Sequence, residues 1–334
     1  MAGGAVDERE ELRFEPYRTE LTGYCYRMLG SAFEAEDAVQ ETMVRAWKAY
    51  ERFEGRAALR SWLYRIATNV CLDMLGSAQR RARPMDLGPA ATARDLPTDP
   101  LPDAAWLGPV PDGRVLPGAG DPADVIVARD SVRLAFVAAL QHLAPRQRAV
   151  LVLREVLRWS AAETAELLGT TVASVNSALQ RARATLAAAD LAGDPVEPMD
   201  PAQRKLLSRY VDAFERFDVT SLTALLHEDA TLSMPPLELW LRGHADLREW
   251  WLGTGSGCRG SWLVPTVANG MPAYGQYRPG GPDDPGERHR PWALMVLEIS
   301  AGRIWGINNF LDTERLFPLF GLPPYLDERP VVKW

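Results

Sequence analysis

The residues with the clearest chemistry lie on a predicted helix that begins near Thr171 and ends near Leu186. Apolar side chains recur along one face at helical spacing, and that face is expected to pack inward. Its members are Val172, Val175, Leu179, Ala182 and Leu186. The opposite face carries Thr171, Ala173, Ser174, Ser177, Gln180 and Arg181. Glutamine and arginine can pair with base edges in a DNA major groove, and hydroxyls can bind phosphates. This second face therefore has the chemistry of a DNA-reading surface.

Two shorter helices are expected immediately before this one. Pro145 suits the first turn of a helix that runs through Val156, because a proline there loses no hydrogen bond. Ser160, with Glu163 three residues later, predicts a capping box at the start of a second helix. Gly169 supplies a flexible joint to the third. Helices joined by a short glycine-containing turn are typical of a helix-turn-helix. A helical hairpin with a merely solvated polar face is the alternative.

The segment HLAPRQRAVLVLREVLRWSAAETAELLG, followed by VASVNSALQRARATL, resembles region 4 of sigma-70 family factors of the extracytoplasmic-function (ECF) type. The resemblance implies that this domain reads the −35 promoter element. The implied DNA-binding residues are Thr171, Ser174, Ser177, Gln180 and Arg181. Many ECF factors carry a basic residue where this chain has Ala173, so the family's −35 sequence does not transfer to it.

Two further helical segments near the N-terminus carry polar residues. Acidic side chains lie near the start of the segment Glu36–Trp47, where they favour the helix dipole without any partner. A glycine-containing loop and a second helix follow, with arginines available on the outside. Trp47 and Trp62 are expected in the core.

The motifs EDAVQETMVRAW and RFEGRAALRSWLYRIATNVCLD resemble region 2 of ECF sigma factors, and they precede region 4 in the family's order. The resemblance implies that Asp37, Gln40 and Glu41 bind the clamp helices of the polymerase β′ subunit. It also implies capture of an unstacked −10 base, which needs an aromatic wall, exposed backbone and cations. The residues expected to bind the −10 element are Phe53, Gly55, Arg56, Arg60, Arg65, Asn69, Arg80 and Arg81. The basic residues that in the family often follow the residue matched by Asp73 are missing here. Contacts to the upstream edge of the −10 element are therefore expected either to be weaker or to shift toward Arg80 and Arg81.

Residues 84–127 are interpreted as a linker. The stretch 84–124 is rich in Pro, Gly and Ala and holds seven Asp but only two Arg. It shows no helical or strand period, so we expect an extended, largely unstructured tether. In ECF factors this connection threads the RNA-exit path of the polymerase, and negative charge suits that role. An ordinary disordered linker is the alternative. A helix over Asp130–Leu143 is expected to open the next domain.

The last third of the chain predicts a helix over Lys205–Phe217 and then mostly strands. The expected strands are Asp229–Met234, Gly260–Ala268, Ala273–Tyr277, Trp292–Ile299 and Ile304–Phe310, with a hairpin turn at Ala301-Gly302. Helices followed by a meander favour an α+β domain with a curved sheet. The phrase YVDAFERFDVTSLTALLHEDATLSMPP resembles a SnoaL-like domain of the NTF2-like superfamily. His227, Glu228 and Asp229 are acid–base candidates by type, although caps and turns also favour such residues.

The predicted fold class is therefore multidomain, with two all-α sigma domains and a C-terminal α+β cone-shaped SnoaL/NTF2-like domain. The expected boundaries are 1–83 for region 2, 84–127 for the linker, 128–190 for region 4, 191–199 for a short linker and 200–334 for the SnoaL-like domain. The formal net charge is −7, yet the helix-turn-helix segment carries a positive surplus, as a DNA-binding domain should. The scattered residues Cys25, Cys71 and Cys258 fit a reducing cytoplasm. No apolar run is as long as a membrane span requires.

The predicted function is that of an ECF-type sigma factor, not an enzyme, with no cofactor and no metal. The expected partners are the RNA polymerase core, through the β′ clamp helices and β flap, promoter DNA, and a possible small-molecule ligand of the C-terminal domain, which is expected to regulate the chain in cis. One rival is a helix-turn-helix regulator with a ligand-sensing domain. A SnoaL-like enzyme is the other.

Overall fold

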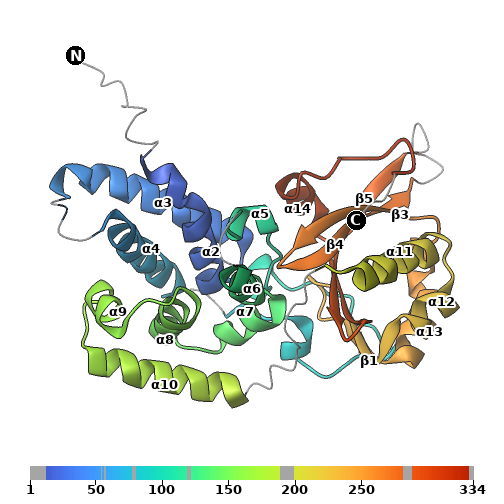
Figure 1. Ribbon diagram of the computed structural model, residues 1–334. Coiled ribbons are helices and arrows are strands. Elements are labelled where there is room, and N and C mark those ends of the chain that lie inside the picture. Colours follow the sequence, from blue (N-terminus) through green and yellow to red (C-terminus); the bar gives the residue numbers. More distant parts are fainter. Residues whose placement is uncertain are drawn as a thin grey trace. The chain divides into compact units, whose positions relative to one another are not determined.

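The computed structural model describes residues 13–53, 55, 58–76, 80–118, 122–188, 199–280 and 288–330, and the chain divides into two compact units. The first unit joins Met1–Arg81 with Asp112–Ala192, and the second joins Ala82–Pro111 with Gly193–Trp334 (Figure 1). Each unit therefore contains two separate stretches of sequence. The reason is that the connection between the two helical parts of the first unit packs with the C-terminal domain.

Among the described residues, three α-helices form the N-terminal part of the first unit. A 3₁₀ turn at Glu15–Tyr17 precedes α2 (Arg18–Leu29), which ends at Gly30. Gly30 has a φ of 74°, a left-handed conformation that glycine adopts without steric cost. Ser31 then caps α3 (Ala32–Ala49), and its hydroxyl accepts a hydrogen bond of 3.3 Å from the Glu34 backbone N–H. A short η2 (Tyr50–Arg52) leads toward α4 (Leu59–Leu75).

The rest of the first unit contains the helix-turn-helix. Its elements are α5 (Asp112–Val115), α6 (Pro122–Asp130), α7 (Leu134–Gln141), α8 (Pro145–Leu151), a π-helical turn η5 (Val152–Val156), α9 (Ala161–Leu167) and α10 (Val172–Ala188). The continuous helix expected over Asp130–Leu143 is wrong at its start, because a turn separates α6 from α7. The Ser131 hydroxyl, in that turn, donates to the Ala128 carbonyl and accepts from the buried Arg27.

The second unit is built on a six-stranded mixed sheet. Its strands are β1 (Leu226–Ser233), β2 (Trp240–Arg242), β3 (Trp262–Ala268), β4 (Met271–Pro279), β5 (His289–Ser300) and β6 (Arg303–Phe310), in the order β2-β1-β6-β5-β4-β3. The predicted meander of β3 to β6 is confirmed. Ala301 and Gly302 have φ values of 48° and 68°. Both are positive, as a two-residue hairpin turn requires. The short strand β2 and the parallel pairing of β1 with β6 were not predicted.

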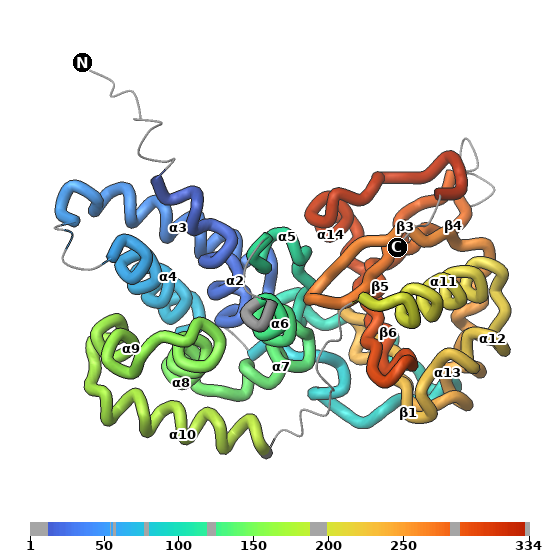
Figure 2. The backbone as a smooth tube through the Cα atoms, viewed as in Figure 1, coloured from blue at the N-terminus to red at the C-terminus, as the bar shows by residue number. Residues whose placement is uncertain are grey.

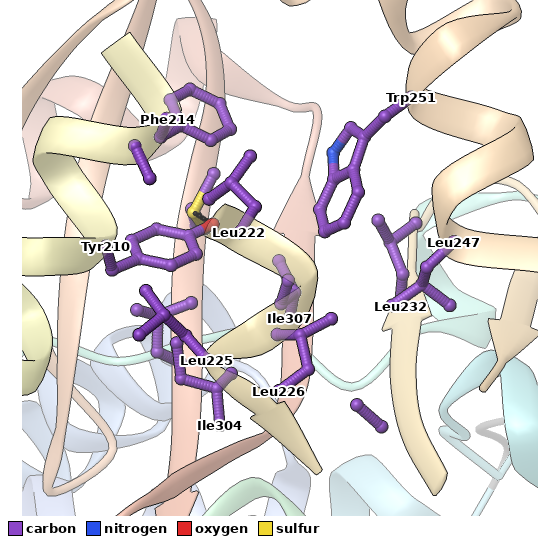
Figure 3. Close-up of a cluster of buried hydrophobic side chains, with 14 of the residues drawn as sticks. Tyr210, Phe214, Leu222, Leu225, Leu226, Leu232, Leu247, Trp251, Ile304 and Ile307 are labelled. Atoms are coloured by element: carbon purple, nitrogen blue, oxygen red, sulfur yellow. Dashed lines mark hydrogen bonds between the residues drawn. The ribbon is translucent and has the colours of Figure 1, made fainter. Parts of the chain in front are cut away.

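Large apolar side chains fill the space between this sheet and its helices α11 (Pro201–Glu215), α12 (Val219–Ala224) and α13 (His244–Leu252). Tyr210 and Phe214 of α11 lie over the sheet, and Trp251 of α13 lies opposite them (Figure 3). The Tyr210 hydroxyl donates to Met295 Sδ at 3.1 Å, and burial raises the pKa of this tyrosine. The interior of this curved sheet is therefore a packed hydrophobic core.

Residues Ala82–Pro111, which we call the strap, are packed and ordered, so the expectation of a largely unstructured tether is wrong for them. The strap contains two 3₁₀ turns, at Pro84–Asp86 and Asp103–Ala105. Three apolar residues of the strap, Trp106, Leu107 and Val110, are 5%, 2% and 0% exposed. These apolar residues bury enough surface to order a segment whose Pro, Gly and Asp content favours disorder.

Candidate nucleic-acid and polymerase interface

The polar face of α10 is exposed to solvent along its length. Thr171, Ser174, Ser177, Gln180 and Arg181 are all exposed, while Val175, Leu179 and Ala182 of the opposite face are buried. Val172 is 44% exposed, so its expected inward position is wrong. It lies in the first helical turn, beyond the residues that contact the neighbouring helices. Within the described residues, no hydrogen bond or ion pair engages the Arg181 guanidinium, which leaves its donors available to a ligand.

Local capping positions this helix and the one before it. The Ser160 hydroxyl accepts from the Glu163 backbone at 3.1 Å, and the Glu163 carboxylate accepts from the Ser160 backbone at 2.7 Å. This is the predicted capping box. Gly169, with a φ of 60°, makes the turn into α10. Thr171 Oγ1 accepts from the Ser174 backbone at 3.1 Å, so the Thr171 hydroxyl caps α10 as well as facing outward.

Ser160→Ala is expected to lower the free energy of unfolding by about 1 kcal/mol at neutral pH. Hydrogen bonds from Ser160 hold the pKa of the Glu163 carboxyl below its usual value. A depressed folded-state pKa stabilises the protein above the unfolded value of about 4.3, and this stabilisation is lost as the pH falls through the folded value. The difference between variant and parent in urea denaturation should therefore shrink in acid. Ser177→Ala, at an exposed serine, is the control, and an equal Ser160→Ala effect at all pH values would contradict the prediction.

The outer face of α3 combines carboxylates with apolar side chains. Asp37, Gln40 and Glu41 are exposed, and the same face continues to Val44 and Trp47, each 43% exposed. The expectation that Trp47 belongs to the core is therefore wrong. Sequence reasoning missed Val44 and Trp47 as surface residues, although Val44 lies three residues after Glu41 and Trp47 lies seven residues after Gln40, spacings that place both on the exposed helical face.

The loop before α4 is bordered by aromatic rings. Phe53 lies 4.9 Å from Trp62 and 6.1 Å from Tyr50, measured between ring centroids. Gly55 is exposed with a φ of 68°. An aromatic ring and an exposed glycine backbone are the features expected of a loop that captures an unstacked base. Arg56 lies outside the described residues.

On α4 itself, Asn69 is exposed, but the arginines have partners. The Arg60 guanidinium pairs with Glu20 at 2.8 Å and lies 5.7 Å from the centre of the Trp159 ring. Arg65 donates to the backbone carbonyl of Glu166 at 3.0 Å. Trp159 and Glu166 both belong to the helix-turn-helix part, which therefore lies against one side of α4.

The upstream cations are engaged in the same way. Arg80 lies against the ring of His142, and Arg81 pairs with Glu34 of α3. The Arg81 side chain is only 10% exposed. In this conformation Arg81 therefore supports the helical unit, and DNA binding by Arg81 would require that pair to open.

We call the contact of α2 and α4 with α6 to α9 the seam. Two buried arginines cross it without a carboxylate partner among the described residues. Arg27 donates to the Ser131 hydroxyl at 2.7 and 3.0 Å. Arg148 donates to the carbonyl of Met28 and to Gln141 Oε1, the latter at 2.7 Å. Burial lowers the pKa of each arginine to about 10, so both remain cations at neutral pH.

The acid–base candidates of the C-terminal domain form no enclosed site among the described residues. The His227 ring stacks on Trp305 at 3.4 Å, and Asp229 pairs with Arg242 at 3.0 Å. Glu228 and Asp229 are exposed at the start of β1. The contacts of these residues are those of a strand start and a surface ion pair. Across the part of the chain that the structure describes, no group of three or more His, Cys, Asp or Glu is placed to hold a metal.

Family models match three parts of the chain. They are Sigma-70 region 2 at residues 13–81, Sigma-70 region 4 at residues 133–186 and a SnoaL-like domain at residues 207–307. The chain belongs to the ECF RNA polymerase sigma factors that carry a fused C-terminal SnoaL-like domain. Curated relatives that match most of the chain are named ECF RNA polymerase sigma factors.

Several curated relatives and a solved structure resemble most of the chain. The ECF RNA polymerase sigma factor SigG of Mycobacterium tuberculosis is 44% identical, over 93% of this chain and 83% of the relative. SigJ of the same organism is 30% identical, over 90% of this chain and 92% of the relative. The crystal structure of SigJ shares the fold with a TM-score of 0.59, covering 93% of this chain and 99% of that one. None of the described helices is both long and apolar enough to span a membrane.

Proposed function

We propose that this chain binds core RNA polymerase and directs initiation at promoters that carry −10 and −35 elements. The polar face of α10 would read the −35 element. The loop at Phe53 and Gly55, the outer side of α4, and the cations Arg80 and Arg81 would bind the −10 element. The outer face of α3 would dock on the β′ clamp helices, and the helix-turn-helix part on the β flap. The C-terminal domain would regulate these contacts in cis, and the chain would act in the cytoplasm.

The observation that carries this proposal is the division of α10 into a packed face and a free polar face. Gln180 and Arg181 are both exposed, and neither side chain has a partner among the described residues. An arginine with open donors can make the bidentate contact to guanine that dominates specific recognition in the major groove. Because the chain belongs to the sigma factors, we propose that the polar face of α10 binds promoter DNA.

The polymerase-binding part of the proposal is supported by the exposed apolar residues of α3. An exposed tryptophan beside carboxylates is typical of a protein interface, because aromatic side chains contribute most of the binding energy at such surfaces. Trp47→Ser is therefore expected to weaken core binding about fivefold while leaving the fold intact. Leu252→Ser, at another exposed apolar residue, is the matched control and should bind normally. Unchanged affinity of the Trp47 variant would remove this face from the interface.

The test of the function is transcription in vitro with purified core polymerase. Genomic fragments serve as templates, because the promoter sequence is unknown. Specific transcripts that depend on the chain, and that fall when Trp47 is replaced, are the expected result. The rival helix-turn-helix regulator would instead bind duplex DNA tightly without polymerase and yield no new transcripts.

The C-terminal domain offers one cavity outside the hydrophobic core as a candidate ligand site among the described residues. We propose that a ligand binds in this cavity of about 740 Å³, between β5, α14 (Thr313–Leu319) and the chain that follows α14. Arg288, Arg290, Phe317, Leu322 and Tyr325 are among its lining residues. This combination of apolar walls and arginines fits a small amphipathic anion.

A further inference from the structure

The strap contacts the rest of the second unit at points spread along its length. Near its start, the Ala91 N–H donates to the Trp240 carbonyl at 2.9 Å, and Trp240 Nε1 donates to the Gly88 carbonyl at 3.0 Å. The Ala93 N–H donates to Asp246 Oδ1 of α13 at 3.1 Å. The strap lies beside β1 and α13 in the tube view (Figure 2). Its first half is therefore attached to the edge of the sheet.

The second half of the strap is attached just as firmly. The Leu101 N–H donates to the Pro236 carbonyl at 2.9 Å, and Asp103 pairs with Arg315 at 3.0 Å. Val110 and Asn269 exchange two hydrogen bonds, each of 3.0 Å. Asn269 is fully buried in the turn between β3 and β4. Such paired backbone contacts are the kind that order an irregular segment.

The two ends of the strap also pair with each other. The Ala82 N–H donates to the Ala105 carbonyl at 2.8 Å, and the Leu107 N–H donates to the Ala82 carbonyl at 3.0 Å. Ala82 and Trp106 are thus partners in a short parallel bridge. The roughly 25 residues between them form a closed loop, although they could span about 80 Å when extended. While the bridge holds, they add almost nothing to the reach of the chain.

The lost reach matters because the strap is the covalent connection between the two promoter-reading parts. The −10 and −35 elements lie about 25 base pairs apart, or about 85 Å along B-DNA at about 3.4 Å per pair. With the loop closed, the chain from Leu107 to Pro122 can span about 50 Å, and with the loop open, the chain from Ala82 can span about 130 Å. The seam must separate in either case. Only with the loop open is the connecting chain long enough to span the distance between the two promoter elements without being fully extended.

We propose that the C-terminal domain inhibits initiation by holding the strap as a closed loop. This inference rests on the proposed function. It states that the regulation in cis is inhibitory and that it acts through the conformation of the strap. Binding to polymerase and promoter competes with strap docking, because both use the same connection in different conformations. The C-terminal domain therefore acts on the linker length, and need not cover any DNA-binding residue.

An insertion experiment tests this mechanism on the full chain. A Gly/Ser segment of about 20 residues placed after Gly118 lengthens the connection outside the loop and leaves every strap contact in place. The same segment placed after the exposed Thr98 lies inside the closed loop and adds no reach while the bridge holds. The first insertion is expected to raise specific transcription on the order of tenfold, and the second should leave it at the parental level. Equal transcription from the two insertion variants would overturn the proposal.

Hydrogen exchange provides a second readout that does not depend on activity. The amides of Ala91, Ala93 and Leu101 should be protected in the free chain and should exchange faster in the complex with polymerase and promoter. Continued protection in an actively initiating complex would overturn the proposal and leave the sigma function intact. If no version gives specific transcripts and none binds core polymerase, the proposed function itself fails.

Discussion

Replacing Arg148 with methionine is expected to lower the free energy of unfolding of the helical unit by about 3 kcal/mol. Arg148 is 4% exposed, and its guanidinium donates hydrogen bonds to the carbonyls of Met28, Gln141 and Leu143 and to Gln141 Oε1. Methionine fills a similar volume but leaves these buried acceptors without hydrogen bonds. Each unsatisfied buried acceptor lowers the stability by about 1–3 kcal/mol. Relief from burying a cation offsets part of that loss, so the net value is smaller than the sum.

Urea denaturation measures the change, and hydrogen exchange of peptides from α2 and α8 locates it. Arg146→Met is the matched control, because Arg146 lies on the same helix but is exposed. We expect the control to change stability by no more than about 0.5 kcal/mol. Faster exchange in α8 alone, with α2 unaffected, would show that Arg148 stabilises its own helix and does not hold the seam.

Arg181→Ala should weaken binding of the polymerase holoenzyme to a −35-containing promoter by about 2 kcal/mol, or roughly thirtyfold. The loss is expected because the Arg181 guanidinium is exposed on the polar face of α10 and no described residue engages it, so that it is available to bind DNA. Affinity for core polymerase should not change, because that contact is proposed for other surfaces. Promoter fragments with single substitutions in the −35 element should also be discriminated less well.

Arg183→Ala is the appropriate control for this prediction. Arg183 lies on the same helix and pairs with Glu155 at 2.6 Å, so it has the same charge but is engaged within the protein. Its removal should reduce promoter affinity only slightly. If Arg181→Ala lowered core binding as much as promoter binding, its role would be structural.

Locally encoded features could be predicted from the sequence. The capping box at Ser160 and the two faces of α10 depend on residues within one or two helical turns, and both agree with the structure except at Val172. The strap could not be predicted, because the groups that hold it, such as Trp240 and Asn269, lie far away in the chain. The amino-acid composition of the strap favours disorder, but its long-range contacts hold it in an ordered conformation.

The errors at single residues have similar causes. A tryptophan in a helix is usually assigned to the core, but Trp47 lies on the exposed face of α3 with Gln40 and Val44. The reverse holds for Arg27 and Arg148, which are arginines in the interior. Rules based on residue type fail at these positions because an exposed tryptophan and buried arginines depart from the average distribution of polar and apolar residues.

The chemistry of the seam has a consequence for the response to ionic strength. Its buried arginines bind neutral oxygens, and salt screens such shielded contacts only weakly. Binding of arginines to DNA phosphates releases counterions, so the affinity for DNA falls steeply as the salt concentration rises. Salt therefore weakens the DNA-bound conformation and hardly affects the closed one. The helical unit should therefore keep its seam closed at high salt concentration and open to bind promoter DNA at low salt concentration.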